Sequence, residues 1–240
     1  EGNHAAQQGI WQLLRPLFTS RAFYVICILN IGLTVLRETF NHWTPRLLKE
    51  VVGLDDGPAA MCAMVFPGVG ILSVLLSGWL SDRLGRQRGR IMVPCLVAAL
   101  LSLIGLCVFP IEGNAPLALA LIGSTSFFLL APYSFLSGVI AVDLGGKRGS
   151  SSAAGFIDSA GYFGGALSGV GIGWIATQYN WHAVLIALAG VGAMSLVVAV
   201  IHWAFEEVHY LNMKKTAGKA AVEPPHLPAM MPKPAVQEGT

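Results

Sequence analysis

The chain has 240 residues, of which 54% are hydrophobic and only 12% are charged. Soluble domains usually carry about a quarter charged residues, so this composition excludes an ordinary soluble domain and indicates lipid as the solvent. The net charge of +2 is too small to indicate nucleic acid as a partner, and the four cysteines lie in apolar runs without the spacing of a metal site or a disulfide framework. We therefore predict no nucleic acid, metal or cofactor for this chain.

Six apolar segments follow one another along the chain, and each has the roughly 20 residues that a helix needs to cross a bilayer. They cover residues 22–48, 58–81, 91–110, 116–142, 151–176 and 182–205. The sequence therefore predicts an all-α polytopic membrane protein whose six transmembrane helices occupy residues 22–205. The mixed, polar residues 1–21 are expected to be a cytoplasmic segment from the middle of a longer protein. Residues 206–240, rich in Ala, Pro and Lys, are expected to be a disordered cytoplasmic tail.

The first apolar segment carries a stripe of polar residues through its middle. Asn30, Thr34, Arg37, Asn41 and Thr44 recur at steps of four and three residues, which places them on one face of a helix. A polar face within a membrane lies against protein or a water-filled cavity, because lipid cannot satisfy its hydrogen bonds. The stripe therefore predicts a polar pathway beside this helix.

Arg37 is the most informative residue of the stripe, because an arginine within a bilayer costs about 2.5 kcal/mol or more on insertion scales. Its planar guanidinium binds phosphate or carboxylate oxygens through two parallel hydrogen bonds and keeps its charge at every physiological pH. Glu38 and His42, four residues apart, form a second row beside it. We interpret Arg37 as an anion-binding residue; the alternatives are that it snorkels to the outer interface or pairs permanently with Glu38 or Asp158.

The connection between the second and third segments has a distinctive pattern. Residues 78–90 read Gly-Trp-Leu-Ser-Asp-Arg-Leu-Gly-Arg-Gln-Arg-Gly-Arg. This resembles the G-x-x-x-D-R-x-G-R-R loop of the major facilitator superfamily, with Gln87 at a position that is commonly basic. The resemblance implies a twelve-helix carrier of two related halves, with this chain as the second half and an N-terminal six-helix half as its partner. The residues expected to form a conformational latch on the cytoplasmic side are Gly78, Asp82, Arg83, Gly85 and Arg86.

The fourth and fifth segments contribute further polar candidates. Tyr133 and Ser137 are four residues apart, and Asp158 and Tyr162 share one face of the fifth segment. An acid within a membrane helix requires a partner. We therefore interpret Asp158 as a substrate contact, as a counter-ion of the buried arginine, or as half of a structural pair with another helix. Glycines recur every fourth residue over Gly161–Gly173, which favours close packing of helices in lipid.

A second resemblance indicates the class of substrate. Residues 35–51, with Leu-Arg, Trp-x-Pro and Leu-Lys-Glu-Val, are similar to the seventh helix of the organophosphate:inorganic phosphate antiporters, the family of glycerol-3-phosphate and hexose-phosphate exchangers. The similarity continues at residues 131–132, 143–148, 153–156 and 161–165. It implies that Arg37 grips the phosphate together with an arginine of the other half. Asp158 departs from the simplest pattern of that family.

We expect the substrate site to be lined by Arg37 together with nearby polar side chains, namely Asn30, Thr34, Asn41, His42, Tyr133, Ser137, Asp158 and Tyr162. The resemblance implies exchange of an organic phosphate for inorganic phosphate. One alternative is a proton-coupled symporter of an organic carboxylate such as a sugar acid, in which Glu38, His42 or Asp158 carries the proton. Another is a membrane sensor of sugar phosphate. We expect no enzyme, because the sequence has no nucleophile elbow, phosphate-binding glycine loop or metal cluster.

The distribution of positive charge predicts the orientation. Twelve of the 15 Lys and Arg residues fall toward the two ends of the chain or in the connections at 83–90 and 147–148, whereas the opposite connections hold only Arg46 and Lys49. By the positive-inside rule, both ends of the chain lie in the cytoplasm. We expect a bacterial inner (plasma) membrane, with lipid and an anionic small molecule as further partners.

Overall fold

The computed structural model describes residues 15, 17–83 and 89–222, and for residues 147–148 and 206–222 it describes the backbone alone. The chain divides into two compact units, Glu1–Phe205 and Glu206–Thr240. Helices account for nearly all of the described residues, and those residues contain no strand, as the sequence predicts. Most of the predicted segment 1–21 lies outside the described residues.

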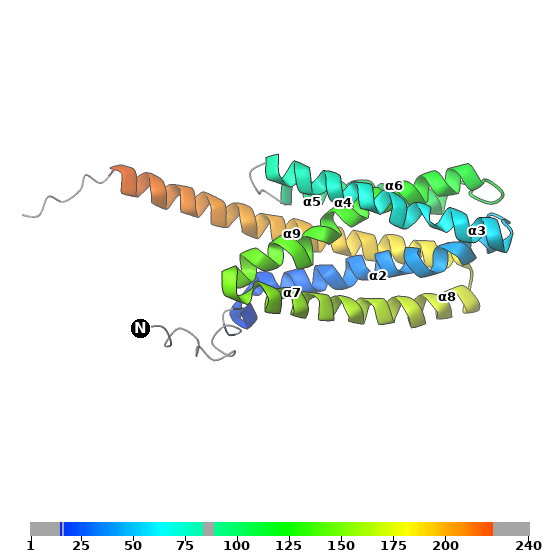
Figure 1. Cartoon of the computed structure of the whole chain (residues 1–240), viewed down its shortest axis with the longest axis horizontal. Coiled ribbons are helices and arrows are strands. Elements are labelled where there is room, and N and C mark those ends of the chain that lie inside the picture. Colours follow the sequence, from blue (N-terminus) through cyan, green and yellow to red (C-terminus); the bar gives the residue numbers. More distant parts are fainter. Residues whose placement is uncertain (1–14, 16, 84–88, 223–240) are drawn as a thin grey trace, which may run out of the picture. The chain divides into compact units, whose positions relative to one another are not determined.

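The helices follow the six predicted apolar segments closely (Figure 1). The first four segments become α2 (Arg21–Glu50), α3 (Asp56–Ala63) with α4 (Val65–Arg83), α5 (Gly89–Val108), and α6 (Ala115–Phe135) with the π-helical turn η1 (Leu136–Ile140). The last two become α7 (Ala141–Leu167) with the π-helical turn η2 (Ser168–Ile172) and α8 (Gly173–Gln178), and then α9 (Trp181–Val222). The π-helical turns continue the helices on either side of them, so they widen a helix without ending it.

Local chemistry explains several of the helix boundaries. Asn114 caps α6, because its side-chain oxygen accepts a hydrogen bond from the backbone N–H of Leu117 at 3.2 Å. Gly146 has φ 62° and ψ −173° inside α7, a conformation that a residue with a Cβ rarely adopts. It marks the corner between the fourth and fifth predicted segments, and the helix of the fourth segment therefore ends near residue 146.

Among the described residues, five helical stretches are long and apolar enough to cross a membrane: Arg21–Glu50, Asp56–Arg83, Gly89–Val108, Ala115–Gly146 and Trp181–Phe205. The fifth predicted segment, residues 151–176, is helical over its whole length but is not among them. It is rich in Gly and Ser and contains Asp158. Its polarity fits its place in the bundle, since α7 packs along the polar helix α2.

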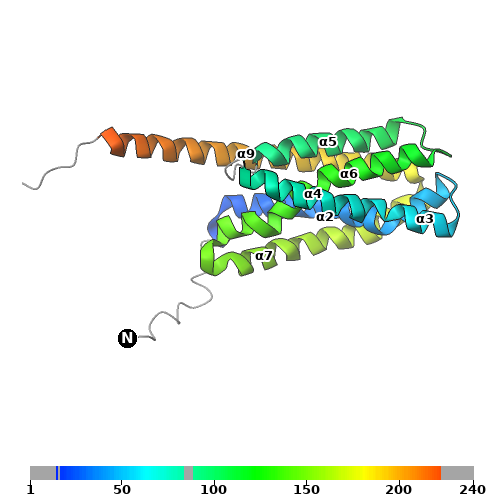
Figure 2. The same ribbon diagram turned by 45° about the horizontal axis from the view of Figure 1, so that its top comes forward.

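Helix α2 lies among several neighbours, with α7, α3 and α6 packed against it, while α6 packs against both α4 and α5 (Figures 1 and 2). At some contacts the helices lie so close together that only a glycine fits between them. A Cβ on Gly164 of α7 would overlap the backbone carbonyl of Ile31, and one on Gly32 of α2 would overlap the hydroxyl of Ser195 in α9. The predicted glycine ridge contributes at Gly161 and Gly173, which contact α2, whereas Gly169 faces open space.

Side-chain hydrogen bonds join the helices at several points, as expected where lipid cannot compete for them. The hydroxyls of Thr39 in α2 and Ser168 in η2 lie 2.9 Å apart, and both residues are buried. Ser102 of α5 and Ser124 of α6 form a similar pair at 2.7 Å. These bonds fix the rotation of α2 and α5 relative to their neighbours.

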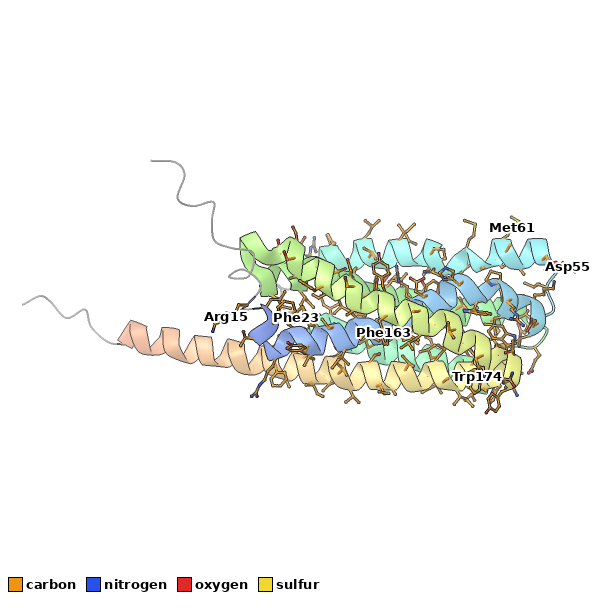
Figure 3. The ribbon with its side chains drawn as sticks, turned by 90° about the horizontal axis from the view of Figure 1, so that it is seen from below. Arg15, Phe23, Asp55, Met61, Phe163 and Trp174 are labelled. Atoms are coloured by element: carbon orange, nitrogen blue, oxygen red, sulfur yellow. The ribbon has the colours of Figure 1, made fainter. Side chains whose placement is uncertain are left out.

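The two ends of the first unit are distinct. Figure 3 places Arg15 and Phe23 at one end and Asp55, Met61 and Trp174 at the other, because successive helices run in opposite directions. The second unit begins within α9, which continues to Val222. Residues 206–222, which the sequence assigns to a disordered tail, are therefore helical. The sequence pattern missed this because the extension is polar and has no apolar stripe.

Candidate functional site

The guanidinium of Arg37 sits half-buried on the middle of α2, with 29% of its side chain exposed. Its Cζ lies 4.5 Å from the centroid of the Tyr133 ring, which projects from α6. The Nε atom is buried and has no hydrogen-bond partner, although one Nη atom donates to the carboxylate of Glu38. A charged donor is expensive to bury without a partner, so this nitrogen still lacks the acceptor that its burial calls for.

Glu38 bridges two basic residues. One of its carboxylate oxygens, Oε1, accepts the hydrogen bond from Arg37, and the other, Oε2, lies 3.2 Å from Nδ1 of His42. The Glu38 side chain is 18% exposed, whereas that of His42 is 71% exposed. The sequence places Glu38 in a row beside the arginine, and the structure joins the two rows through this carboxylate.

Two cavities flank this group of charges. The larger one, of about 670 Å³, is lined by Thr34, Glu38, His42 and Arg46 of α2 and by residues of α7 and η2, among them Tyr162. The smaller one, of about 340 Å³, is lined by Arg37 and Asn41 together with apolar residues of α4 and Leu130 of α6. Glu38 therefore faces a cavity with several polar and charged side chains, and Arg37 faces a mainly apolar one.

Within the predicted set, four residues line these cavities besides Arg37, and a fifth contacts its guanidinium. Thr34, His42 and Tyr162 face the larger cavity, Asn41 faces the smaller one, and Tyr133 stacks on the guanidinium. The Thr34 hydroxyl is buried and has no hydrogen-bond partner, which again leaves a polar atom available to a ligand. Polar side chains of α2 and α7 thus line the larger cavity, while Asn41 and the Tyr133 ring of α6 lie beside Arg37.

Three predicted residues do not belong to this group. Asn30 is buried, and its amide donates a 2.7 Å hydrogen bond to the carbonyl of Ile157, so it joins α2 to α7 and does not line either cavity. Ser137 lies in the π-helical turn η1, whose wider turn removes the simple four-residue register with Tyr133. It lines neither of the two cavities.

Asp158 is half-buried on α7 and makes no hydrogen bond or ion pair with another described side chain. The counter-ion of Arg37 is Glu38, so of the two partners considered for Arg37, Glu38 and Asp158, the structure places the first beside it. The reason is distance along the chain: Glu38 follows Arg37 directly and reaches it without any help from tertiary packing. Asp158 also lies outside both cavities.

The predicted latch lies partly outside the described residues, since Gly85 and Arg86 fall in the undescribed stretch 84–88. Gly78 is half-buried on α4, and Asp82 and Arg83 are exposed in its last turn. The Arg83 guanidinium lies 4.1 Å from the centroid of the Trp79 ring. Arg83 is therefore held by an aromatic face, a contact that the motif alone does not predict.

Sequence analysis missed a second charged cluster, where α2 ends and α9 begins. Glu50 accepts hydrogen bonds of 2.6 Å from Nε of Arg46 and from Nε1 of Trp181. Lys49 pairs with Asp56 at 2.6 Å. The four-residue spacing of Arg46 and Glu50 is a signal that would have found the first contact. The hydrogen bond from Trp181, which lies 131 residues farther along the chain, has no signal in the local sequence.

Comparisons with known proteins identify the family of the chain. The family model described as Major Facilitator Superfamily matches residues 2–169. The chain is 28% identical over 198 residues to a probable hexose phosphate transport protein of Chlamydia trachomatis and 25% identical over 197 residues to the glycerol-3-phosphate transporter of Bacillus subtilis. It is 27% identical over 190 residues to the membrane sensor protein UhpC of Salmonella typhimurium.

These matches cover 80%, 80% and 78% of the chain but only 42%, 43% and 42% of the respective relatives. The chain thus spans less than half the length of the curated relatives it matches. The functions in their names concern the whole of those longer proteins.

Proposed function

The chain belongs to the major facilitator superfamily, and from this premise we propose that it is the C-terminal six-helix half of a secondary transporter that exchanges an organic phosphate for inorganic phosphate. Two of the similar proteins are named as transporters of hexose phosphate and of glycerol 3-phosphate. Both cargoes carry a phosphate group, and this group is what an arginine recognises best.

The observation that carries the proposal is the state of Arg37. Its charge is permanent, its Nε is buried without an acceptor, and Glu38 occupies only one of its terminal nitrogens. Phosphate offers several oxygens to such a planar donor, and Asn41 lines the same cavity as Arg37. Arg37 therefore neutralises the bound phosphate from one side.

A partner must cover this side of α2. Asn41 and His42 are exposed near the middle of a membrane-crossing helix, where contact with lipid is unfavourable. An N-terminal six-helix half would enclose the two cavities and supply a second cation opposite Arg37. In this proposal the halves rock about the site, so that it opens alternately to the two sides of the membrane. Binding must differ between the two states to shift their populations.

The proposed location is a bacterial inner (plasma) membrane with both ends of the chain in the cytoplasm. The organisms of the similar proteins and the positive residues near both ends support this placement. The residues at the opposite end include the acidic Asp55 and Asp56. The latch formed by Gly78, Asp82 and Arg83, with Gly85 and Arg86, would then act on the cytoplasmic side.

The test is phosphate exchange by the complete carrier in lipid vesicles loaded with inorganic phosphate. We expect Arg37→Lys to lower the rate at limiting external phosphate by about tenfold or more, because a lysine replaces a planar fork by a single point charge. Arg21→Lys is the matched control, since Arg21 is an exposed residue at the start of the same helix. Equal exchange by wild type and Arg37→Lys would remove Arg37 from the mechanism.

A sensor of sugar phosphate is the second candidate, favoured by the similarity to a membrane sensor protein. The same binding residues would serve a sensor, but transport would not follow binding. Saturable binding of an organic phosphate without measurable flux in the vesicles would favour this function. Uptake that needs a proton gradient and no internal phosphate would instead favour a symporter.

A further inference from the structure

We propose that anion binding at Arg37 is coupled to the uptake of a proton by His42, with the Glu38 carboxylate as the link between them. This inference rests on the proposed function, because it assumes that an anion binds to Arg37. It adds a proton-linked step to the exchange and assigns the proton to one nitrogen atom.

The geometry defines the state of the imidazole. Nδ1 of His42 lies 3.0 Å from the backbone carbonyl oxygen of Glu38 and 3.2 Å from its carboxylate Oε2. Both neighbours are hydrogen-bond acceptors, so Nδ1 carries a hydrogen and donates it. The second ring nitrogen, Nε2, is therefore the atom that accepts the additional proton. His42 lines the larger cavity, so in the complete carrier a proton reaches it whenever that cavity opens to water.

Anion binding and proton uptake are coupled because both change the net charge around Glu38. Without an anion, the positive charge of Arg37 is matched by the negative charge of Glu38. A phosphate on Arg37 draws the guanidinium away from Glu38 and leaves two anions close together, which is unfavourable. A proton on His42 places a new positive charge beside Glu38 and restores the balance. Because such coupling is reciprocal, a protonated His42 also favours anion binding.

In the described part of the chain, few titratable or charged groups besides Glu38 lie near His42. On α2 itself the neighbouring charges are Glu38 and Arg46, and Arg46 is paired with Glu50. Helix α7 presents Tyr162 to the same cavity, and η2 presents only Ser168 and Gly169 there.

The remaining neighbours of α2 present no titrating group to His42 among the described residues. Tyr133 of α6 stacks on Arg37, Asp56 of α3 pairs with Lys49, and the residues of α4 that line the smaller cavity are apolar or glycine. Trp181 of α9 binds Glu50. Histidine is the side chain that ordinarily changes charge between about pH 5 and 8, and the coupling is therefore tested in that range.

The experiment measures the half-saturating concentration of inorganic phosphate for exchange by the complete carrier between pH 6 and 8. Phosphate itself titrates in this range, so the comparison is made between variants at each pH. Relative to His42→Gln, we expect the wild type to bind phosphate about five- to tenfold more tightly at pH 6 and equally at pH 8. His42→Lys, which keeps a positive charge, should retain tight binding at pH 8. His182→Gln, an exposed histidine outside both cavities, should follow the wild type.

A second measurement tests the proton directly. Adding phosphate to the purified carrier in weakly buffered detergent solution at pH 7 should take up more protons for the wild type than for His42→Gln or Glu38→Gln. Identical pH profiles and identical proton uptake in wild type and His42→Gln would overturn the coupling while leaving the exchange function intact. Absence of phosphate exchange by the wild type at every pH would instead overturn the proposed function, and this inference with it.

Discussion

The indole Nε1 of Trp181 donates a 2.6 Å hydrogen bond to the carboxylate of Glu50, which lies 131 residues earlier in the chain. The other oxygen of that carboxylate accepts a hydrogen bond from Arg46, so the group is shared between two donors. Trp43 and Trp181 also contact each other edge to face, with ring centroids 6.4 Å apart. These contacts hold the end of α2 against the beginning of α9.

Replacing Trp181 by Phe should destabilise the folded protein. The variant keeps an aromatic ring but loses the hydrogen bond to a charged group, which is worth about 1.5–3 kcal/mol. We expect a lower melting temperature in detergent, measured by tryptophan-independent methods such as light scattering or thiol labelling. Trp174→Phe is the control, because Trp174 is exposed and its ring contacts only Tyr179 edge to face. An equal fall in melting temperature in both variants would contradict a specific role of the hydrogen bond to Glu50.

Gly164→Ala should disturb the contact between α2 and α7. The new methyl group would overlap the backbone carbonyl of Ile31, and backbone cannot rotate away as a side chain can. Overpacking of this kind costs about 1–3 kcal/mol. In the matched control Gly155→Ala, on the same helix, the methyl group meets open space. The yield of monodisperse protein and the melting temperature should fall for Gly164→Ala alone; unchanged values there would mean that the helices are farther apart.

Changes at Tyr133 distinguish a ring that supports Arg37 from a hydroxyl that binds substrate. Tyr133→Phe keeps the aromatic face that lies 4.5 Å from the guanidinium carbon, whereas Tyr133→Leu removes it. A cation–π contact of this kind is worth about 0.5–2 kcal/mol. We expect the half-saturating phosphate concentration to rise about two- to thirtyfold in the leucine variant and to change little in the phenylalanine variant. A large change in the phenylalanine variant would show that the hydroxyl itself binds the substrate.

The orientation can be measured with an impermeant thiol reagent on intact cells. In a background without the four native cysteines, Asp55→Cys should react from outside, because Asp55 follows α2 at the end opposite Arg15 (Figure 3). Lys214→Cys should react only after permeabilisation, as the positive-inside rule places the end of the chain in the cytoplasm. The reverse pattern would invert the proposed topology.

Much of the fold follows from the sequence because its signals are local. Apolar length predicts the membrane-crossing helices, and turn residues such as Gly113 and Asn114 mark the end of one and the beginning of the next. Arg37 stands out for the same reason, since an arginine within an apolar run needs no tertiary information to be noticed. The membership in the major facilitator superfamily, indicated by residues 78–90, is confirmed by the family comparison.

The neighbours of each polar residue were decided by tertiary packing. Spacing alone places Asn30 and Arg37 on one face, yet α7 covers Asn30 and leaves Arg37 beside a cavity. Asp158 looked equally suited to pair with Arg37, but a half-buried position on α7 does not bring it there. Periodicity reports which residues share a side of one helix. Which other helix lies against that side depends on contacts between distant segments, and no local pattern records them.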